Sequence, residues 1–338
     1  MSRVARSTAT PAFGLPRGLQ LATLVDHPPE GDEWLHEQKF DGYRILAVLE
    51  PGRVRLLSRR FKDWTAEFPT ISHAVAELPA RRAILDGEVA VLLPDGRTSF
   101  QGLQNAFGGQ DPNLVYFVFD LLAIQDESLV GLPLEQRKAR LAALVQPQGG
   151  KPGAIRYSDH VIGHGGALFQ LACARGLEGI VSKRRDQPYQ PGRGLTWQKT
   201  KCQRRQELVI GGFTDPEGSR TGLGALLVGY YEHGKLCYAG KVGTGYSNKM
   251  LAELRQLLEP IEQAGSSFEP EPARALTGPH RHWVEPKYVA EVAFGEWTAD
   301  GRLRHPSFQG LRHDKIAREV VRERAAVVLA DSPPESLP

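Results

Sequence analysis

The sequence has 338 residues, of which 41% are hydrophobic and 24% charged, and its net charge is +3. A chain of this length is too long for one compact core, so we expect two domains, with three as an alternative. No apolar run approaches the roughly 20 residues that a membrane-spanning helix needs, which excludes a transmembrane protein. Residues 1–18 lack the apolar block of a secretory signal, and we expect flexible tails at 1–18 and 326–338.

The three cysteines are Cys173, Cys202 and Cys237, and no two of them form a CxxC pair. An odd number without close spacing indicates neither a disulfide framework nor a zinc site. We therefore expect a reducing, cytoplasmic location.

Basic residues cluster at 183–185, 199–205 and 302–315. Such clusters could hold a polyanion such as nucleic acid. Solvated surface charge explains them as well, so both interpretations stay open at this point.

The first half of the chain alternates apolar and polar residues in a way that predicts strands. These strands are expected at 43–49, 54–58, 84–93 and 115–122. Dipeptides that tolerate positive φ, such as Asp41-Gly42 and Pro51-Gly52, predict tight turns near them. Antiparallel sheet should therefore dominate.

Helical spacing of apolar residues appears at 134–144, at 167–175 and at 250–261, where Ser247 could cap the helix. The segments 146–153 and 264–275 are rich in Gly, Pro, Ser and Gln and should be exposed loops. No internal repeat is present.

A second domain is expected to begin near 205–207, where a basic stretch gives way to a new series of short strands. These strands are predicted at 207–213, 223–232, 235–242 and 287–294. With one intervening helix they suit a small OB-type barrel. We thus expect an α+β protein with a mainly antiparallel domain at 19–205 and a barrel at 206–325.

The segment around Lys39 reads KxDGxR, with Asp41, Gly42 and Arg44 completing it. Alone it could be an ordinary Asp-Gly hairpin with charged flanks. An ordered series of further charged segments follows it, each set among apolar strand residues. They are Ser58-Arg59, Asp86-Gly87-Glu88, Phe119-Asp120, the residues EGIVSK at 178–183, Lys199-Thr200-Lys201 and RHDK at 312–315.

These segments, in this order, resemble the covalent nucleotidyltransferase superfamily of ATP-dependent DNA ligases, RNA ligases and mRNA capping enzymes. The resemblance spans 34–316 and is greatest to the ligase domain of bacterial end-joining DNA ligases, because residues 297–308 lead directly into 312–315. It implies an adenylation domain followed by an OB-fold domain. It also implies a bacterial, nucleoid-associated enzyme of DNA repair.

The resemblance implies ATP-dependent sealing of 5′-phosphate/3′-hydroxyl breaks by three phosphoryl transfers, with Lys39 as the nucleophile that carries AMP. A lysine amine attacks only when deprotonated, so neighbouring cations and partial burial are expected to depress the pKa of Lys39. The implied partners are nicked or broken duplex DNA, a DNA-end-binding protein and a repair polymerase, with no membrane.

The resemblance also assigns the nucleoside contacts. Glu37 would read the adenine edge, Arg44 and Glu88 would contact the ribose, and Phe119 would stack on the base. Ordinary salt bridges remain the alternative for Glu37 and Arg44, and plain strand core remains the alternative for Phe119.

For the triphosphate, the resemblance points to Asp41 and Glu178 as ligands of Mg²⁺ or Mn²⁺, which hard oxygen donors suit better than zinc. Asp41 could instead only stabilise its turn. Lys199 and Lys201 alternate along a predicted strand, so both should point to one face and grip a phosphate, while Thr200 points away.

Further basic residues are expected to meet phosphates. Arg59 resembles the family residue that contacts the phosphate of the bound nucleotide or the 5′-phosphate of the nick. Lys183 and Arg193 are additional possible contacts to DNA phosphates, with ordinary surface charge as the alternative.

In the second domain, Arg312, Asp314 and Lys315 match residues that the family uses to orient the leaving pyrophosphate in the first step only. A role in one step implies a domain that closes over ATP and then reopens.

Three other interpretations remain. The superfamily lysine is shared with RNA ligases and capping enzymes, and nothing in the sequence alone demands deoxyribose. An NAD-dependent ligase is disfavoured because only 38 residues precede Lys39. The chain could also be a catalytically silent module that binds DNA ends.

Overall fold

The computed structural model describes residues 14–106, 111, 113–145, 153–216, 218, 221–278 and 280–326. The chain divides into two compact units, Met1–Ser99 with Ala106–Cys202 and Arg324–Pro338, and Phe100–Asn105 with Gln203–Glu323. Most of both expected tails and of the expected loop at 146–153 lies outside the described residues. Within the described ranges, no helix is long and apolar enough to cross a membrane.

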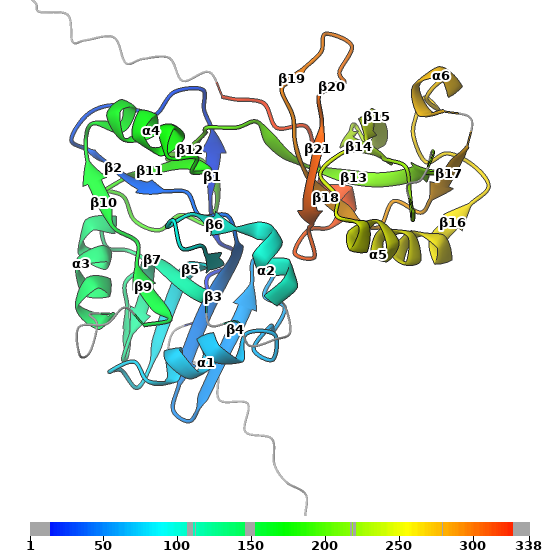
Figure 1. The fold of residues 1–338 in the computed structure, drawn as a ribbon. Coiled ribbons are helices and arrows are strands. Elements are labelled where there is room, and N and C mark those ends of the chain that lie inside the picture. Colours follow the sequence, from blue (N-terminus) through cyan, green and yellow to red (C-terminus); the bar gives the residue numbers. More distant parts are fainter. Residues whose placement is uncertain are drawn as a thin grey trace, which may run out of the picture. The chain divides into compact units, whose positions relative to one another are not determined.

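The first unit contains a five-stranded sheet that is central to the site described below (Figure 1). Its order is β1 (Gln20–Leu24), β12 (Gly192–Lys201), β11 (Gly179–Arg184), β2 (Trp34–Gln38) and β10 (His160–Ile162). All neighbours are antiparallel except β1, which runs parallel to β12. Strands distant in sequence are therefore adjacent in the sheet.

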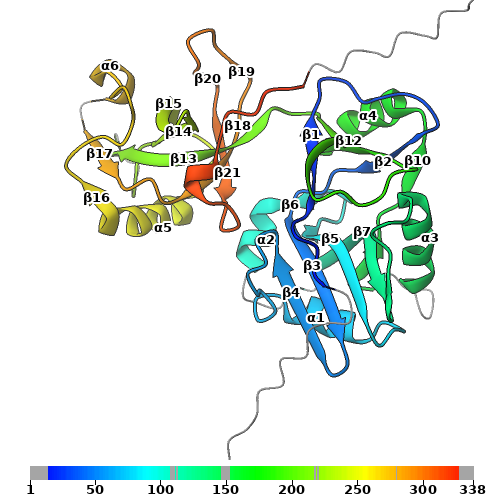
Figure 2. The same ribbon diagram turned by 180° about the vertical axis from the view of Figure 1, so that it is seen from behind.

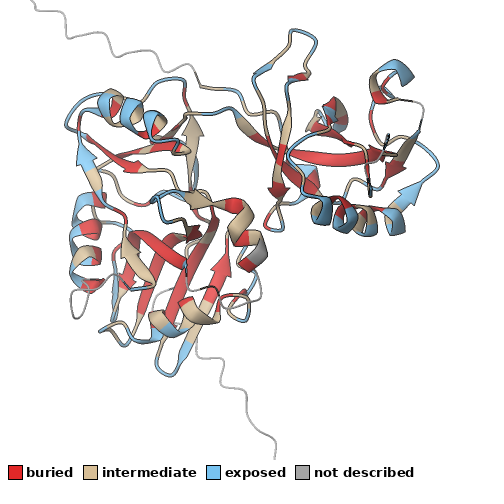
Figure 3. Cartoon of the chain, in the orientation of Figure 1, coloured by how far each residue is buried: buried red, intermediate tan, exposed pale blue. Residues whose placement is uncertain are grey.

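The second sheet of this unit is antiparallel along its main path. Its order is β4 (Arg53–Ser58), β3 (Tyr43–Glu50), β5 (Ala83–Leu92), β7 (Leu114–Ile124) and β8 (Glu127–Ser128), with β6 (Thr98–Ser99) beside β5 and β9 (Ile155–Tyr157) parallel to β7. Strands β5 and β7 are buried over nearly their whole length (Figure 3). The apolar runs in these strands thus form the core of the unit.

Helices cover these sheets. Helix α1 (Pro69–Ala76) packs on β4, α3 (Leu134–Leu144) on β7, and α4 (Gly165–Ala174) on β11 and β2. Helix α2 (Phe100–Ala106) follows β6 in the chain, but its residues Phe100–Asn105 belong to the second unit. Seen from behind, β1 again lies beside β12 (Figure 2). The predicted helix at 134–144 is confirmed, and the one predicted at 167–175 begins and ends slightly earlier.

The second unit is built on β13 (Arg205–Thr214), which pairs with β14 (Leu226–Glu232) on one side and with β17 (Arg281–Val284) and β18 (Val289–Ala293) on the other. The remaining elements are β15 (Lys235–Val242), β16 (Glu262–Gln263), β19 (Glu296–Trp297), β20 (Leu303–Arg304), β21 (Ser307–Leu311), α5 (Asn248–Leu258), α6 (Arg274–Thr277), and the 3-10 turns η1 (Glu259–Ile261) and η2 (Ala317–Glu319). The predicted strands match β13, β14, β15 and β18. Strands β17 and β21 were not predicted.

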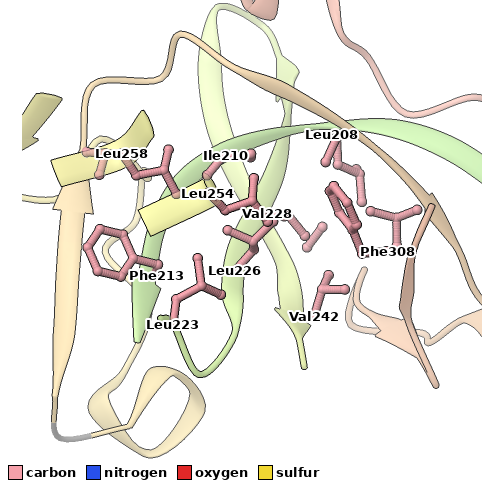
Figure 4. Packing of buried hydrophobic residues seen from close by; sticks show 14 of the residues in the cluster. Leu208, Ile210, Phe213, Leu223, Leu226, Val228, Val242, Leu254, Leu258 and Phe308 are labelled. Carbon is pink, nitrogen blue, oxygen red and sulfur yellow. The ribbon is translucent and has the colours of Figure 1, made fainter. Parts of the chain in front are cut away.

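Helix α5 closes the core of this unit. Its Leu251, Leu254 and Leu258 pack with strand residues such as Ile210 and Val228 in one buried cluster (Figure 4). The predicted cap is confirmed, because the Ser247 hydroxyl accepts a hydrogen bond from the backbone N–H of Met250 at 3.3 Å.

A disulfide between Cys173 and Cys202 joins the end of α4 to the residue after β12. The expectation that no disulfide forms was therefore wrong. The two residues are 29 apart in sequence, but α4 packs on β11 and β11 pairs with β12, which brings their Cα atoms to 5.1 Å. Cysteine spacing alone cannot reveal such a pair, and the bridge removes the cysteine-based reason for expecting a reducing compartment.

The disulfide should stabilise the first unit by restricting its unfolded chain. Because the disulfide closes a loop of 29 residues, we expect that its reduction, or Cys173→Ser, lowers the free energy of unfolding by about 2–4 kcal/mol. Urea unfolding with and without reductant measures the difference, and Cys237→Ser is the control that should leave it unchanged. Three titratable thiols in the denatured, unreduced protein would contradict the bridge.

A buried ion pair fixes α3 to the second sheet. Arg137 and Asp120 are both 0% exposed, and the guanidinium donates from Nε and Nη2 to the two carboxylate oxygens at 2.8 Å each. Arg137 also donates to the carbonyls of Leu132 and Gln187. Each of the three guanidinium nitrogens thus donates at least one hydrogen bond inside the protein.

Removing one partner would strand the other charge in the core. Arg137→Met should lower the free energy of unfolding by about 3–5 kcal/mol. Arg140→Met on the same helix, at an exposed position, should cost little. Denaturant unfolding of the two variants gives the comparison, and equal midpoints would contradict a structural role for the buried pair.

Candidate active site

Strand β11 aligns the segment that contains Lys39. In the antiparallel register of β11 and β2, Val181 lies opposite Glu37 and Ile180 opposite Gln38. The backbone N–H of Lys39 then donates to the carbonyl of Gly179 at 2.9 Å, which continues the pairing one residue past β2. This backbone hydrogen bond thus places Lys39 beside Gly179, the residue after Glu178.

The other edge of β11 aligns the two lysines of β12. Gly179 lies opposite Lys201 and Val181 opposite Lys199. Both lysine side chains are half-buried, whereas Thr200 between them is buried, so the expected alternation is present. Three segments distant in sequence therefore meet across three neighbouring strands (Figure 1).

Two glycines permit this close approach. Gly179 has φ +148°, and a Cβ there would lie 2.1 Å from the carbonyl oxygen of Thr200. A Cβ on Gly42 would lie 2.2 Å from the carbonyl oxygen of Val89. Any side chain would push the strands apart, which explains why glycine follows both Glu178 and Asp41.

Lys39 and Glu178 form an ion pair, with Nζ 2.6 Å from Oε1. Burial lowers the pKa of Lys39, but the charge of Glu178, with a smaller contribution from Glu88, more than offsets burial and the charge of Lys201, so the net pKa is raised. The expected depression of this pKa was therefore wrong for the structure as it stands. Lys201 does lower this pKa, but Glu178, in contact with the amine at 2.6 Å, has the larger effect.

The acidic residues near Lys39 could hold a divalent ion. Glu178 lies against Lys39, Glu88 is close enough to influence its pKa, and Asp41 follows two residues later, its backbone N–H bound to Thr98 Oγ1 at 2.9 Å. Mg²⁺ prefers carboxylate oxygens and commonly takes only one or two from protein, with phosphates and water as the rest. One or two carboxylates from this set fit such an ion, whereas the described residues contain no group of three or more His, Cys, Asp or Glu side chains placed to hold a metal ion by themselves.

Arg44 lies on β3 opposite Glu88 on β5. Its guanidinium donates to both oxygens of the buried Asp86, from Nε at 2.6 Å and from Nη2 at 2.8 Å, and Tyr189 Oη donates to the same carboxylate. Burial works against the charge, but Asp86 outweighs it and raises the pKa of Arg44. This bidentate pair fixes the plane of Arg44 and was not predicted from the sequence.

Phe119 is 8% exposed and lies among cations. The Lys183 ammonium lies 4.1 Å from the ring centroid and the Arg44 guanidinium 4.7 Å from it, and Trp197 contacts the ring edge-on. The ring is thus part of the core and also borders the charged site.

Glu37 is 2% exposed, and buried donors surround its carboxylate. Lys138 Nζ donates to Oε1 at 2.7 Å, while Lys183 Nζ and Ser158 Oγ donate to Oε2 at 2.9 and 2.8 Å. Burial opposes ionisation, but the two lysines lower the net pKa of Glu37. Lys183, itself 2% exposed, is therefore inside the protein, and the predicted contact from Lys183 to a DNA phosphate is not the arrangement found.

The other two basic residues predicted to meet phosphates lie nearer the surface. Arg59 follows β4 in a turn and is half-buried. Arg193 is exposed on β12, where its guanidinium donates to the carbonyl of Ala22. Among their neighbours in the first two basic clusters, Arg184 pairs with Asp186, so part of that positive charge is compensated locally.

The predicted pyrophosphate-orienting residues form an ion cluster in the second unit. Arg312 donates to both oxygens of Asp314 at 2.8 Å and to Glu291 at 3.3 Å, and Lys315 Nζ lies 2.7 Å from Glu207. Burial raises the pKa of Asp314, but Arg312 outweighs this and the net pKa is lowered. The three predicted residues are thus adjacent and charged.

Several residues that contact the site received no role from sequence reasoning, although two of them, Asp86 and Asp120, belong to the motif segments named there. They are Asp86, Asp120, Arg137, Lys138, Ser158 and Tyr189. A signal did exist, because Asp86 and Asp120 interrupt apolar strands, and Arg137 and Lys138 occupy core-facing positions between Leu134 and Leu141 of α3. Buried charges require partners, so these residues had to pair with one another or with the motifs.

Two family models match the chain. Residues 20–201 match the ATP dependent DNA ligase domain, and residues 219–315 match the ATP dependent DNA ligase C terminal region. The first match covers more than half of the chain. Together they confirm an adenylation domain followed by an OB-fold domain.

Curated relatives are similar over most of this chain. The multifunctional non-homologous end joining protein LigD of Pseudomonas aeruginosa is 44% identical over 311 residues, which cover 91% of this chain and 36% of that protein. The multifunctional non-homologous end joining DNA repair protein LigD of Mycobacterium tuberculosis is 40% identical over 297 residues, covering 87% of this chain and 38% of that protein. The chain thus spans just over a third of the length of these relatives.

A solved structure of mycobacterial DNA ligase D complexed with ATP and MES is also similar. Its TM-score is 0.65 at 37% sequence identity, covering 90% of this chain and 98% of that one. On the matched motifs, the fold and these relatives, the chain belongs to the family of ATP-dependent DNA ligases.

Proposed function

We propose that this chain seals 5′-phosphate/3′-hydroxyl breaks in duplex DNA through an AMP attached to Lys39. The observation that carries the proposal is the convergence on β11, where Lys39 and Glu178 lie in contact and Lys199 and Lys201 follow on the next strand. A nucleophile, a carboxylate and two phosphate-binding cations are what covalent nucleotidyl transfer requires.

In the first step the Lys39 amine attacks the α-phosphorus of ATP, an N–P bond forms, and the bond to pyrophosphate breaks. The amine must first lose its proton and its ion pair with Glu178, because the pair favours the charged form. AMP then passes to the DNA 5′-phosphate, and the neighbouring 3′-hydroxyl displaces it in the last step. Lys199 and Lys201 would hold the phosphate that carries the transferred charge.

A divalent ion, Mg²⁺ or Mn²⁺, would neutralise charge on the phosphates when it is bound. Glu178 and Asp41 are the residues that we propose to hold it. If Glu178 turns its oxygens to a cation, it also ceases to stabilise the ammonium of Lys39. The same carboxylate would then serve both roles.

For the nucleoside we retain the assignments made from the sequence. Glu37 and Phe119 would recognise the adenine, and Arg44 and Glu88 the ribose. The support is positional, since Arg44 lies opposite Glu88 and also over the Phe119 ring. Arg59 would meet a phosphate of the nucleotide or of the nick.

For the DNA we propose contacts through its phosphates, with Arg193 among them, so that binding shows little sequence preference and weakens with salt. Arg193 is supported by its exposure on β12. By analogy with the end-joining proteins named above, a DNA-end-binding protein and a repair polymerase would act with this chain on the bacterial nucleoid, in the cytoplasm.

DNA is favoured over the RNA-ligase and capping alternatives because both matched family models are of ATP-dependent DNA ligases. A silent DNA-end-binding module is disfavoured because Lys39, Glu178 and the two lysines of β12 are all present and adjacent. Retention of a costly, half-buried charged cluster has no use in a module that only holds DNA ends.

Loss of the Lys39 amine should abolish covalent labelling. Incubation with ATP labelled in the α-phosphate and Mg²⁺ or Mn²⁺, followed by denaturing electrophoresis, should leave label on the unaltered chain and none on Lys39→Ala. Lys39→Arg, which can keep the ion pair with Glu178, should also remain unlabelled because a guanidinium is not nucleophilic at neutral pH. The exposed Lys62→Ala is the control expected to label normally.

If no variant and not even the unaltered chain takes up label, after removal of AMP bound during expression, the covalent mechanism is refuted. Binding of DNA ends without label would then identify the chain as a binding module.

Asp314 should matter for the first step alone. Asp314→Asn should slow self-adenylation by roughly 10²-fold, because the residues that orient pyrophosphate lose their organising carboxylate. Sealing of pre-adenylated nicked DNA by the same preparation should remain within a few-fold of the unaltered chain, which also shows that the variant is folded. Asp300→Asn, an exposed carboxylate of the same unit, is the matched control, and equal losses in both assays would contradict the assignment.

A further inference from the structure

Glu37 is held by two buried lysines where one would neutralise it. Lys138, from α3, is 1% exposed and takes Oε1 of the carboxylate, while Lys183, from β11, takes Oε2 together with Ser158. A second buried ammonium is costly, since each charge removed from water must be compensated. Charge balance at Glu37 therefore does not account for both lysines.

The two lysines lie in different surroundings. Lys183 Nζ lies over the rings of Phe119, the residue proposed to stack on the base, at 4.1 Å, and of Trp197, at 4.4 Å. Lys138 Nζ lies instead over Tyr157, at 4.4 Å, and donates to the carbonyl of Ser158 at 2.8 Å. Lys183 is thus the cation that contacts Phe119 and Trp197, whereas Lys138 contacts the Glu37 carboxylate without contacting these rings.

Helix α3 forms ion pairs with residues of two motif segments. Its consecutive residues Arg137 and Lys138 reach Asp120, which follows Phe119, and Glu37, which lies two residues before Lys39. The helix therefore sets the aromatic ring and the carboxylate relative to each other through direct ion pairs. Neither Arg137 nor Lys138 has a role in the nucleotide binding proposed for this chain.

Electrostatics agree with this division of roles. Burial lowers the pKa of Lys183 to about 8, Glu37 opposes the shift, and Lys138 adds to it. Lys183 thus gives up its proton more readily than an ordinary lysine, and its charge depends on its contact with Glu37. Without Lys138, Glu37 would have only Lys183 as a cationic partner and could turn toward it.

We propose that Lys138 is a positioning residue for purine recognition, which fixes Glu37 so that Glu37 and Lys183 present a defined acceptor and donor to the edge of a base stacked on Phe119. This inference rests on the proposed function. It assigns the discrimination of adenine from guanine to a residue that does not itself touch the base. The ligand concerned is the purine ring of a nucleoside triphosphate.

The test separates binding from catalysis in the full chain. Single-turnover self-adenylation is measured against ATP and GTP concentration for the unaltered chain, Lys138→Met, Lys138→Arg and the control Arg140→Met, an exposed cation of the same helix. Lys138→Met should raise the concentration of ATP at half-maximal rate roughly ten- to hundredfold, the value of one hydrogen bond to a charged group. The maximal rate should change less than about threefold, and the preference for ATP over GTP should narrow. Lys138→Arg should restore much of the ATP affinity and of the preference for ATP.

Sealing of pre-adenylated nicked DNA, which needs the fold but no free ATP, is measured on the same preparations. The proposal is overturned if Lys138→Met retains sealing and shows unchanged ATP dependence and ATP-over-GTP preference. It is also overturned if the maximal rate, the apparent affinity for ATP and the sealing activity all decline together, since that marks a purely structural role. If Lys138→Met does not fold, Lys138→Gln, which keeps a donor without the charge, carries the same comparison.

Failure of the proposed function has a different outcome. In that case the unaltered chain takes up no label from ATP or GTP at any concentration, whereas either failure of this inference leaves the unaltered chain and Arg140→Met active in self-adenylation.

Discussion

The central position of β11 is the constraint on which the site depends. One edge of this strand is hydrogen-bonded to β2 and the other to β12, so the positions of Lys39, Glu178 and the two lysines of β12 follow from backbone register. A slip of one residue would turn every side chain of β11 to the other face. Gly179 permits the close approach, and the disulfide at Cys202 joins the end of β12 to α4.

Around this register, the first unit encloses an unusual amount of charge. Glu37, Asp86 and Asp120 are each buried, and each accepts from at least one buried or half-buried cation in short, often bidentate, contacts. Such pairs add little net stability, but breaking one is costly, so they hold side chains in single orientations. For a site that must recognise a nucleotide, orientation prepared before binding is the useful property. The ion pair of Lys39 with Glu178 is the exception, because the proposed attack by Lys39 requires that the pair open.

The sequence predicted the elements whose signals are local. Helix α3, strand β15 and the Ser247 cap follow from periodicity and capping chemistry, and the alternation of Lys199 and Lys201 predicted the strand that became β12. The partners of those motifs could not be read in the same way, because Lys138 meets Glu37 across 101 residues and Cys173 meets Cys202 through the packing of α4. The prediction of a lowered pKa for Lys39 failed for a related reason. The sequence indicated neighbouring cations, but it could not show that Glu178 contacts the amine at 2.6 Å and outweighs them.

The account assigns AMP to one lysine, although another has the pKa more favourable to attack. Lys183, with a pKa lowered to about 8, would be the nucleophile if ease of deprotonation decided the outcome, whereas register and access select Lys39. The most direct measurement is tandem mass spectrometry of proteolytic peptides after incubation with ATP and a divalent ion. The account predicts AMP on the peptide containing Lys39 and localised to that residue. AMP localised to Lys183, or to a lysine of β12, would contradict it.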